Sequence, residues 1–253
     1  MTSQNYWAKR FDELTKRDEK EVLREVAVLY DELCKYTEAQ LWELLTNFRN
    51  EANVDYFNYE KLYRLEEQLK EKCVEMGKKE ISLLDDRLTK HCVDVSAILD
   101  KKLPMRSDIK PMDYETAKHI AAQDWVGDGL NYSRRIWTNQ ARLRAMVKDN
   151  LARCMNGNST SEDFIKELRK AFNVSYNQAA TLVRTELAHC RMATQLEKAK
   201  QAGYTYYTYH TRKDGKVCSP ECESLEGKRF SIDQAKAGVN YPCIHPNCRC
   251  WVV

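Results

Sequence analysis

The residue types best suited to binding a metal gather near the carboxyl end of the chain. Five of the ten cysteines and one of the five histidines lie there. They form two clusters, which read Cys218-Ser-Pro-Glu-Cys222 and Cys243-Ile-His-Pro-Asn-Cys248-Arg-Cys250. Thiolates and imidazole on two tight turns can close a tetrahedral Zn²⁺ site, because each turn supplies ligands and the metal joins the turns. The pattern therefore predicts a zinc site that staples this segment.

Other uses of the same groups stay open. Four of the thiols could form two disulfides, the thiols could be free and buried, or a zinc ion with an open position could be catalytic. The chain begins Met-Thr-Ser-Gln-Asn and lacks the basic, apolar and small-residue series of a secretory signal. We therefore expect a reducing compartment, in which clustered cysteines bind metal more often than they cross-link. Catalysis would also need a general base. Glu221 and Glu223 are close in sequence, but carboxylates beside a zinc turn are usually solvated, and this is the simpler interpretation of both.

Composition and charge narrow the class of protein. A chain of 253 residues can form one or two domains, and 31% charged residues suit a protein rich in exposed helix. No run of about 18 apolar residues occurs, so we expect no membrane span. Lys and Arg number 18 against 22 Asp and Glu in residues 1–103, and 16 against 11 in residues 104–203. So small a basic excess does not by itself predict a nucleic-acid binder.

The amino-terminal part of the chain has the pattern of amphipathic helices. Residues 1–103 contain no proline and a single glycine, Gly77. Apolar residues recur there at steps of three and four, most regularly in Ile81, Leu84, Leu88, Cys92, Val95 and Leu99. The pattern predicts a helical bundle or hairpin in which Cys34, Cys73 and Cys92 are core residues. The opening Tyr6-Trp7 is either an aromatic anchor for a partner protein or the start of the first helix.

Two prolines, Pro104 and Pro111, interrupt the helical pattern within eight residues. Proline disfavours helix at itself and at the preceding residue, so we place a domain boundary here, between residues 1–103 and 104–253. Further helices are expected beyond it: from the cap Asp113 to about Trp125, from Asn131 to Met155, from the capping box Ser159-Thr-Ser-Glu162 through Phe172, and from the cap Ser175 to Ala202.

The composition changes after Gly203 from helical to β-rich. Residues 204–210, Tyr-Thr-Tyr-Tyr-Thr-Tyr-His, favour a strand, and Asp214-Gly215 favours a hairpin turn that returns the chain to the first cysteine cluster. We also expect a short helix over residues 231–237 and a final strand over residues 250–253. A sheet this small needs a staple. The predicted fold class is α+β: mainly α-helical, with a small carboxy-terminal zinc-stapled β module over residues 204–253.

The second half of the chain resembles a known family of phage proteins. From roughly residue 125 to 250 it is similar to the phage Mu F-like head-morphogenesis family, the minor capsid proteins of tailed bacteriophages. The resemblance rests on Leu182-Val-Arg-Thr-Glu186, on Gly203 before a tyrosine-rich strand, on Leu225-Glu-Gly-Lys228, and on His245-Pro-Asn-Cys248-Arg-Cys250. The opening Tyr6-Trp7 with Arg10 is also similar to the start of many of these proteins.

The resemblance implies a structural component of the virus particle. Such proteins are present in the virion head or procapsid, which is assembled in the cytoplasm of the host bacterium. They associate with the portal protein, and partners among the major capsid or scaffolding proteins are also implied. Their roles are in head assembly, DNA packaging or DNA delivery, so phage DNA is a further possible partner.

The resemblance also implies a metal-binding carboxy-terminal fold. Because His245 and Cys248 have the spacing of a zinc knuckle, we predict the ligands Cys218, Cys222, His245 and Cys248, with Cys250 as a substitute. Arg184 and Glu186 lie two residues apart and cannot share a helix face. We expect them to support the zinc module or to be solvated.

Two functions of other classes compete with this interpretation. A metal-dependent nuclease or toxin-type enzyme could use Arg184, Glu186 and His210, but the sequence lacks a second acidic cluster, a nucleophile motif and a glycine-rich phosphate loop. We therefore expect no enzymatic activity. Direct binding of nucleic acid by the basic middle segment and the zinc tail is the other alternative, and it would weaken steeply with salt.

Overall fold

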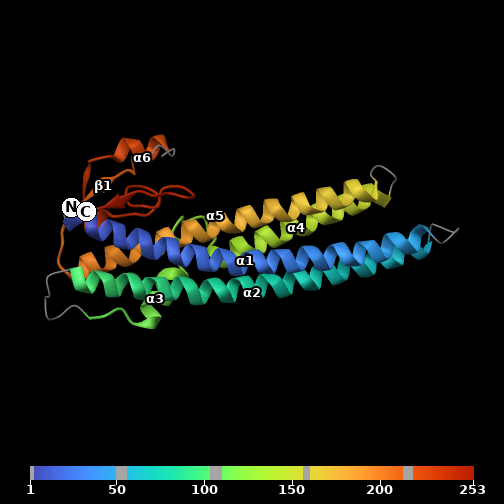
Figure 1. Cartoon of the computed structure of the whole chain (residues 1–253). Coiled ribbons are helices and arrows are strands. Elements are labelled where there is room, and N and C mark those ends of the chain that lie inside the picture. Colours follow the sequence, from blue (N-terminus) through green and yellow to red (C-terminus); the bar gives the residue numbers. More distant parts are fainter. Residues whose placement is uncertain (1–2, 50–55, 103–109, 156–159, 213–218) are drawn as a thin grey trace. The chain divides into compact units, whose positions relative to one another are not determined.

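The structure, a computed structural model, describes residues 3–49, 56–102, 110–155, 160–212 and 219–253. Five helices precede a small sheet, and Figure 1 colours them along the chain. The elements are α1 (Ser3–Arg49), α2 (Tyr56–Lys102), α3 (Tyr114–Ala121), α4 (Tyr132–Met155), α5 (Ser161–Gln201), β1 (Tyr206–His210), α6 (Pro220–Leu225), β2 (Arg229–Ser231), a 3₁₀ helix (Ile232–Gln234) and β3 (Trp251–Val252). The predicted fold class is confirmed in its coarse form, a mainly helical chain with a small sheet near its carboxyl end.

The contacts divide the chain into two compact units that do not follow the sequence order. The first unit comprises residues 1–23, 83–132 and 181–253, and the second comprises residues 24–82 and 133–180. The predicted boundary around Pro104 falls largely outside the described residues, and the division into residues 1–103 and 104–253 stays a prediction. Among the described residues, no helix is long and apolar enough to cross a membrane.

Helices α1 and α2 run antiparallel in both units. In the first unit, Arg17 on α1 pairs with Asp94 on α2, and one turn further along α1 Glu21 pairs with Arg87. Each helix presents one apolar stripe, as the steps of three and four predicted; in the first unit the buried residues Phe11, Leu14, Val95 and Leu99 pack together. The predicted helical hairpin is therefore confirmed. Cys73 and Cys92 are buried, as expected of core residues, whereas Cys34 is only half-buried.

The core of the second unit contains a polar network. The Glu80 side chain is 1% exposed, and its Oε2 lies 3.5 Å from the donating hydroxyl of Tyr30 and 3.1 Å from the donating amide of Gln140. The Tyr30 oxygen in turn accepts from Asn139 at 2.6 Å. Burial has the largest effect on this carboxyl, and it raises the pKa of Glu80 to about 7. The two hydrogen bonds lower the pKa but do not offset the effect of burial.

The observed bounds of helices α3 and α4 agree with the bounds predicted from the sequence, except at the end of α3. Asp113 caps α3 as expected, since its carboxylate accepts the backbone N–H of Thr116 at 2.8 Å. The helix ends at Ala121 and not near Trp125. The cause is Asp124, whose carboxylate accepts the backbone N–H groups of Gly127 and Gly129 and so fixes a loop.

Two predicted helices over residues 159–202 are one continuous helix, α5. Its first turn is held by Thr160, whose hydroxyl accepts the Asp163 N–H at 3.1 Å; Ser159 lies outside the described residues. The predicted cap at Ser175 is wrong, because Ser175 is 1% exposed within the helix. Its position continues the buried stripe of Phe172 and Ala179, so packing overrides its capping preference.

The sheet has three antiparallel strands in the order β2-β1-β3. Strand β1 confirms the tyrosine-rich prediction, and its alternation places Tyr207 and Tyr209 in the core of the first unit. Strand β3 confirms the predicted final strand. The predicted turn at Asp214-Gly215 lies outside the described residues.

The predicted short helix over residues 231–237 is wrong. Ser231 ends strand β2, and only a single 3₁₀ turn follows it. The backbone N–H of Ile232 donates to the carbonyl of Thr205 at 2.9 Å, which draws this segment against β1. The side chain of Ile232 is buried, so sheet pairing and burial prevail over the helical spacing.

The buried carboxyl of Glu80 gives a testable pH dependence. Its pKa is about 7 in the folded chain and 4.5 without burial, so the folded state holds the proton more tightly. The free energy of unfolding should therefore fall as pH rises from about 4.5 to about 7. We expect Glu80→Gln to remove this decline and to stabilise the protein at pH 8 by up to about 3 kcal/mol. Urea unfolding followed by circular dichroism at several pH values measures it.

The matched control is Glu71→Gln, which changes an exposed glutamate on the same helix. This control should leave both the stability and its pH profile within about 0.5 kcal/mol of the unmodified protein. An unchanged pH profile in Glu80→Gln would show that the Glu80 carboxyl ionises normally in the folded state.

Candidate metal centre

Three buried thiols converge in the first unit. The Sγ atoms of Cys222, Cys248 and Cys250 all lie within 4.8 Å of one another, and each side chain is at most 2% exposed. They come from α6 and from the segment before β3, and the chain between them includes β2. All eight cysteines for which a bonding state is described are free thiols. Within the described residues, the disulfide alternative therefore has no support from geometry.

The spacing of these sulfurs fits a tetrahedral metal. A zinc–thiolate bond is about 2.3 Å long, which places two sulfurs of one tetrahedron about 3.8 Å apart. The Sγ atoms of Cys222 and Cys248 are 4.0 Å apart. Such a cluster could hold a metal with little movement of the backbone.

Local structure on α6 positions Cys222. Ser219 caps this short helix by accepting the backbone N–H of Cys222 at 3.3 Å, and Pro220 occupies the first helical turn. The Tyr209 hydroxyl on β1 donates to Cys222 Sγ at 3.4 Å. Burial raises the pKa of the Cys222 thiol to about 11, so the metal-free site favours the protonated form of this group.

A tight turn positions Cys248. Its backbone N–H donates to the carbonyl of His245 at 3.1 Å, and Asn247 takes a left-handed conformation with φ 57°, which asparagine tolerates better than most residues. The N–H of Asn247 donates to the Thr185 hydroxyl on α5 at 3.0 Å, and that hydroxyl donates to the Thr181 carbonyl. The second cysteine cluster is thus fastened directly to α5.

A fourth thiol, Cys243, lies against the cluster. It is 1% exposed, and its hydrogen bond with Cys248 is the main cause of a raised pKa for Cys243 and a lowered pKa for Cys248. Cys243 therefore holds its proton and donates, while Cys248 is the group that most favours the thiolate. A thiolate is the form that binds metal.

The predicted ligands are only partly brought together. Cys222 and Cys248 belong to the buried cluster, and so does the substitute Cys250. Cys218 lies outside the described residues. His245 is not in the mutually close set: its Nδ1 lies 2.8 Å from the Pro246 carbonyl, and its buried Nε2 has no hydrogen-bond partner among the described residues. The exact ligand set stays a prediction.

The two predicted supports of the module make different contacts. The buried carboxylate of Glu186 accepts the indole N–H of Trp125 at 3.1 Å. The guanidinium of Arg184 pairs at 2.8 Å with Glu19 on α1. Both residues flank Thr185, which binds the Asn247 turn. Their role as supports of a metal module stays a prediction, since neither contact reaches a cysteine.

His189 is a core histidine. It is 3% exposed and stacks on Trp125 with ring centroids 4.8 Å apart. Burial lowers its pKa to about 3, and neither ring nitrogen has a hydrogen-bond partner within the described parts of the chain. The ring is therefore neutral at physiological pH and serves packing.

Sequence reasoning missed the tyrosines and the threonine that hold the module. The Tyr241 hydroxyl donates to the Met192 carbonyl of α5 at 2.9 Å, and the Tyr207 hydroxyl donates to the Asn240 carbonyl at 3.1 Å. The inward alternation of β1 was a usable signal for Tyr207. Thr185 lies inside the Leu182–Glu186 motif that carries the family resemblance, but spacing could not indicate its partner, which lies 62 residues away.

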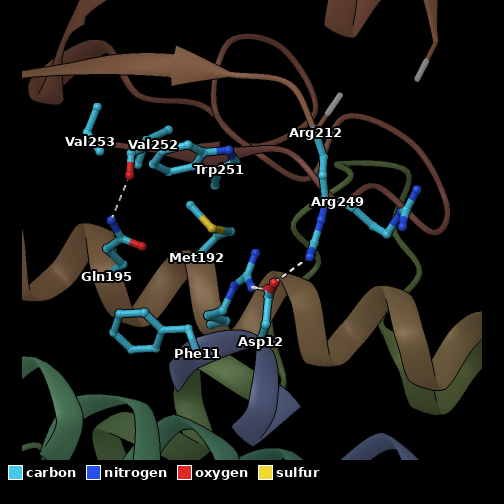
Figure 2. Close-up of a pocket in the computed structure, with 10 residues that line it drawn as sticks. Phe11, Asp12, Met192, Gln195, Arg212, Arg249, Trp251, Val252 and Val253 are labelled. Atoms are coloured by element: carbon cyan, nitrogen blue, oxygen red, sulfur yellow. Dashed lines mark hydrogen bonds and ion pairs between the residues drawn. The ribbon is translucent and has the colours of Figure 1, made fainter. Parts of the chain in front are cut away.

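A carboxylate on α1 ties the same module to α5. Asp12 accepts from Arg191 of α5 at 3.3 Å and from Arg212, just after β1, at 2.5 Å (Figure 2). The amide of Gln195 donates to the Val252 carbonyl of β3 at 3.2 Å. The first unit is thus a set of long helices with a small, cysteine-lined β module fastened to α5.

One comparison with known proteins finds a match for this module. Residues 145–253 match the family model described as Phage Mu protein F like protein, which confirms the resemblance over this part of the chain. Comparison with curated proteins and with solved structures gave no match. The family indicates a role in phage head morphogenesis and an association with the virion.

Removing the Thr185 hydroxyl tests how the cysteine turn is held. Thr185→Val keeps the size of the side chain but leaves the Asn247 N–H without its acceptor, and an unpaired group of this kind costs about 1–3 kcal/mol. We expect faster hydrogen exchange at the amides of Asn247 and Cys248 and a lower melting temperature.

Thr138→Val is the matched control, because the Thr138 hydroxyl makes the same bond to a carbonyl four residues earlier and has no tertiary partner among the residues that the structure describes. Its effect on exchange in the carboxy-terminal module should be negligible. Equal exchange rates in both variants would contradict the assigned role of Thr185.

Proposed function

We propose that the protein is a minor capsid protein of a tailed phage, stapled near its carboxyl end by a structural zinc ion. The observation that carries this proposal is the buried triad Cys222, Cys248 and Cys250 within the part of the chain that matches the Mu F-like family. The three thiols come from both cysteine clusters, as a staple requires.

Cys222, Cys248 and Cys250 would supply three ligands, and Cys218 or His245 would complete four-coordination. The buried, unpartnered Nε2 of His245 supports the histidine as one candidate. Zinc bound at a structural site supplies folding free energy, on the order of 10 kcal/mol. The strands of this sheet have five, three and two residues, so the sheet alone contributes little stability to the module.

The proposed role is in assembly of the phage head. The protein would associate with the portal during procapsid assembly in the host cytoplasm, remain in the virion head, and act in DNA packaging or delivery. Major capsid or scaffolding proteins are further proposed partners, and phage DNA is another. The match to the Mu F-like family supports an assembly role, and this finer description is our inference from it.

Exposed aromatic residues on the second unit support contact with a partner protein. Trp42 on α1 is 50% exposed, and Tyr63 on α2 is 65% exposed. Large aromatic side chains are enriched at protein interfaces and often carry much of the binding energy. The aromatic pair Tyr6-Trp7 that the sequence singled out has no described side-chain environment.

We also propose that the role is structural and not enzymatic. The residues that a hydrolase would need make separate contacts: Arg184 pairs with Glu19, the Glu186 carboxylate accepts from Trp125, and His210 lies 3.5 Å from Glu226.

Metal content and its removal test the staple. We expect about one zinc ion per purified chain by elemental analysis. Chelation should greatly increase hydrogen exchange in residues 219–253 and leave the amides of α1 and α2 protected. Cys222→Ser, Cys248→Ser and Cys250→Ser should each lose most of the zinc, because each removes a thiolate ligand.

Cys34→Ser is the control, since Cys34 is half-buried in the second unit. It should retain the metal. Cys218→Ser and His245→Ala distinguish the fourth ligand, because only the residue that completes the site should reduce zinc content. A metal-free protein with an ordered carboxy-terminal module would overturn the staple.

Co-purification with a portal ring tests the assembly role. The protein should bind a portal from a phage that encodes a similar chain, and Trp42→Ser or Tyr63→Ser should weaken binding at least tenfold if these residues anchor the interface. Tyr114→Ser changes an equally exposed aromatic residue in the first unit and should bind as the unmodified protein does. No binding of the unmodified protein to portal would remove this role without affecting the metal centre.

A further inference from the structure

A second candidate site lies beside the cysteine cluster, in a cavity that the proposed function does not use. The cavity has a volume of about 350 Å³ and lies within the first unit. It is lined by Asp12, Thr15, Lys16 and Glu19 of α1, Arg184, Ala188 and Arg191 of α5, Arg212, and Asn247, Cys248 and Arg249. Four arginines and one lysine face two carboxylates, a net formal charge of +3 among the lining residues.

The two carboxylates are already engaged by arginines of the cavity. Glu19 pairs with Arg184 at 2.8 Å, and Asp12 is shared by Arg191 and Arg212. These pairs hold the guanidinium groups of Arg184, Arg191 and Arg212 in defined positions along the cavity. Because two guanidinium groups share the Asp12 carboxylate, this ion-paired group contributes one unit of the positive excess.

Lys16 and Arg249 add positive charge to the cavity lining from two different parts of the chain. Lys16 is exposed on α1, and Arg249 lies between two thiols of the cysteine cluster. Figure 2 shows Arg212 and Arg249 near each other above α5, with Asp12 below them. Positive charge thus reaches the cavity from α1, from α5 and from the carboxy-terminal module.

A phosphate group fits this arrangement better than a carboxylate. One carboxylate is satisfied by two guanidinium groups, as Asp12 demonstrates within the cavity itself. A phosphate offers more acceptor oxygens and can take bidentate contacts from several arginines together. The cavity is also far larger than a single carboxylate would need.

We propose that this cavity binds a phosphate group, either as a small phosphate ligand or as a backbone phosphate of nucleic acid. The phosphate site is formed by residues of α1 and α5 and by Arg249, and the proposal does not depend on binding to the portal. Its position next to Cys248 means that the order of the cysteine module determines where Arg249 lies. Loss of the metal would then weaken phosphate binding as well.

The test uses two phosphate sources and a charge variant that does not touch the ion pairs. Duplex DNA labelled with a fluorophore reports backbone binding by anisotropy, and inorganic phosphate reports a small ligand by its effect on the melting temperature at constant ionic strength. Lys16→Gln should weaken duplex binding roughly fivefold to tenfold near 0.1 M salt and reduce the salt slope by about one. Lys16→Arg should restore binding.

Lys20→Gln is the matched control, because Lys20 is exposed one turn further along the same helix and does not line the cavity. Arg249→Gln, checked for retained zinc, is a second variant from another element. If inorganic phosphate raises the melting temperature and the protein does not bind duplex DNA, the ligand is a small phosphate compound. If the protein binds duplex DNA and inorganic phosphate displaces it, the ligand is a backbone phosphate of nucleic acid. The proposal is overturned if neither source binds, if Lys16→Gln equals Lys20→Gln, or if polyglutamate of equal charge competes as well as DNA.

Discussion

The carboxy-terminal module depends on bringing three thiols from distant parts of a short chain into one buried place. Cys222 lies on the short capped helix α6, which precedes β2 in the chain. Cys248 and Cys250 lie after β2, at a tight turn and just beyond it. A sheet with strands of five, three and two residues cannot bury enough apolar surface to order both ends by itself. A metal held by these thiols would supply the missing constraint, because its ligands fix α6 and the final turn with respect to each other.

The module is also positioned on helix α5 by contacts that do not involve metal. Thr185 receives the Asn247 N–H, and the Tyr241 hydroxyl reaches the Met192 carbonyl. Asp12 adds a charged link from α1 through Arg191, so α1, α5 and the module form a single framework in the first unit. The same framework creates the arginine-lined cavity.

Much of the helical structure could be predicted because its signals are local. Apolar steps of three and four located the long helices, and Asp113 was recognisable as a cap from its neighbours. Ser175 was misread for the same reason: its local preference is to cap, but burial inside α5 decides its conformation. Cys222 and Cys248 of the triad were predicted as ligands and Cys250 as a substitute, because spacing alone does not decide which thiols of the second cluster meet Cys222. The contact of Thr185 was not predicted although Thr185 belongs to the Leu182–Glu186 motif, because local sequence does not indicate a partner 62 residues away.

The most direct measurement of the central claim is X-ray absorption at the zinc edge of the purified protein. The account predicts a four-coordinate ion with three or four sulfur neighbours at about 2.3 Å, and any remaining neighbour a nitrogen or a fourth sulfur. Replacing Cys250 by serine should reduce the number of sulfur neighbours or abolish the signal. A protein without bound zinc, or an ion surrounded by oxygen alone, would contradict the account.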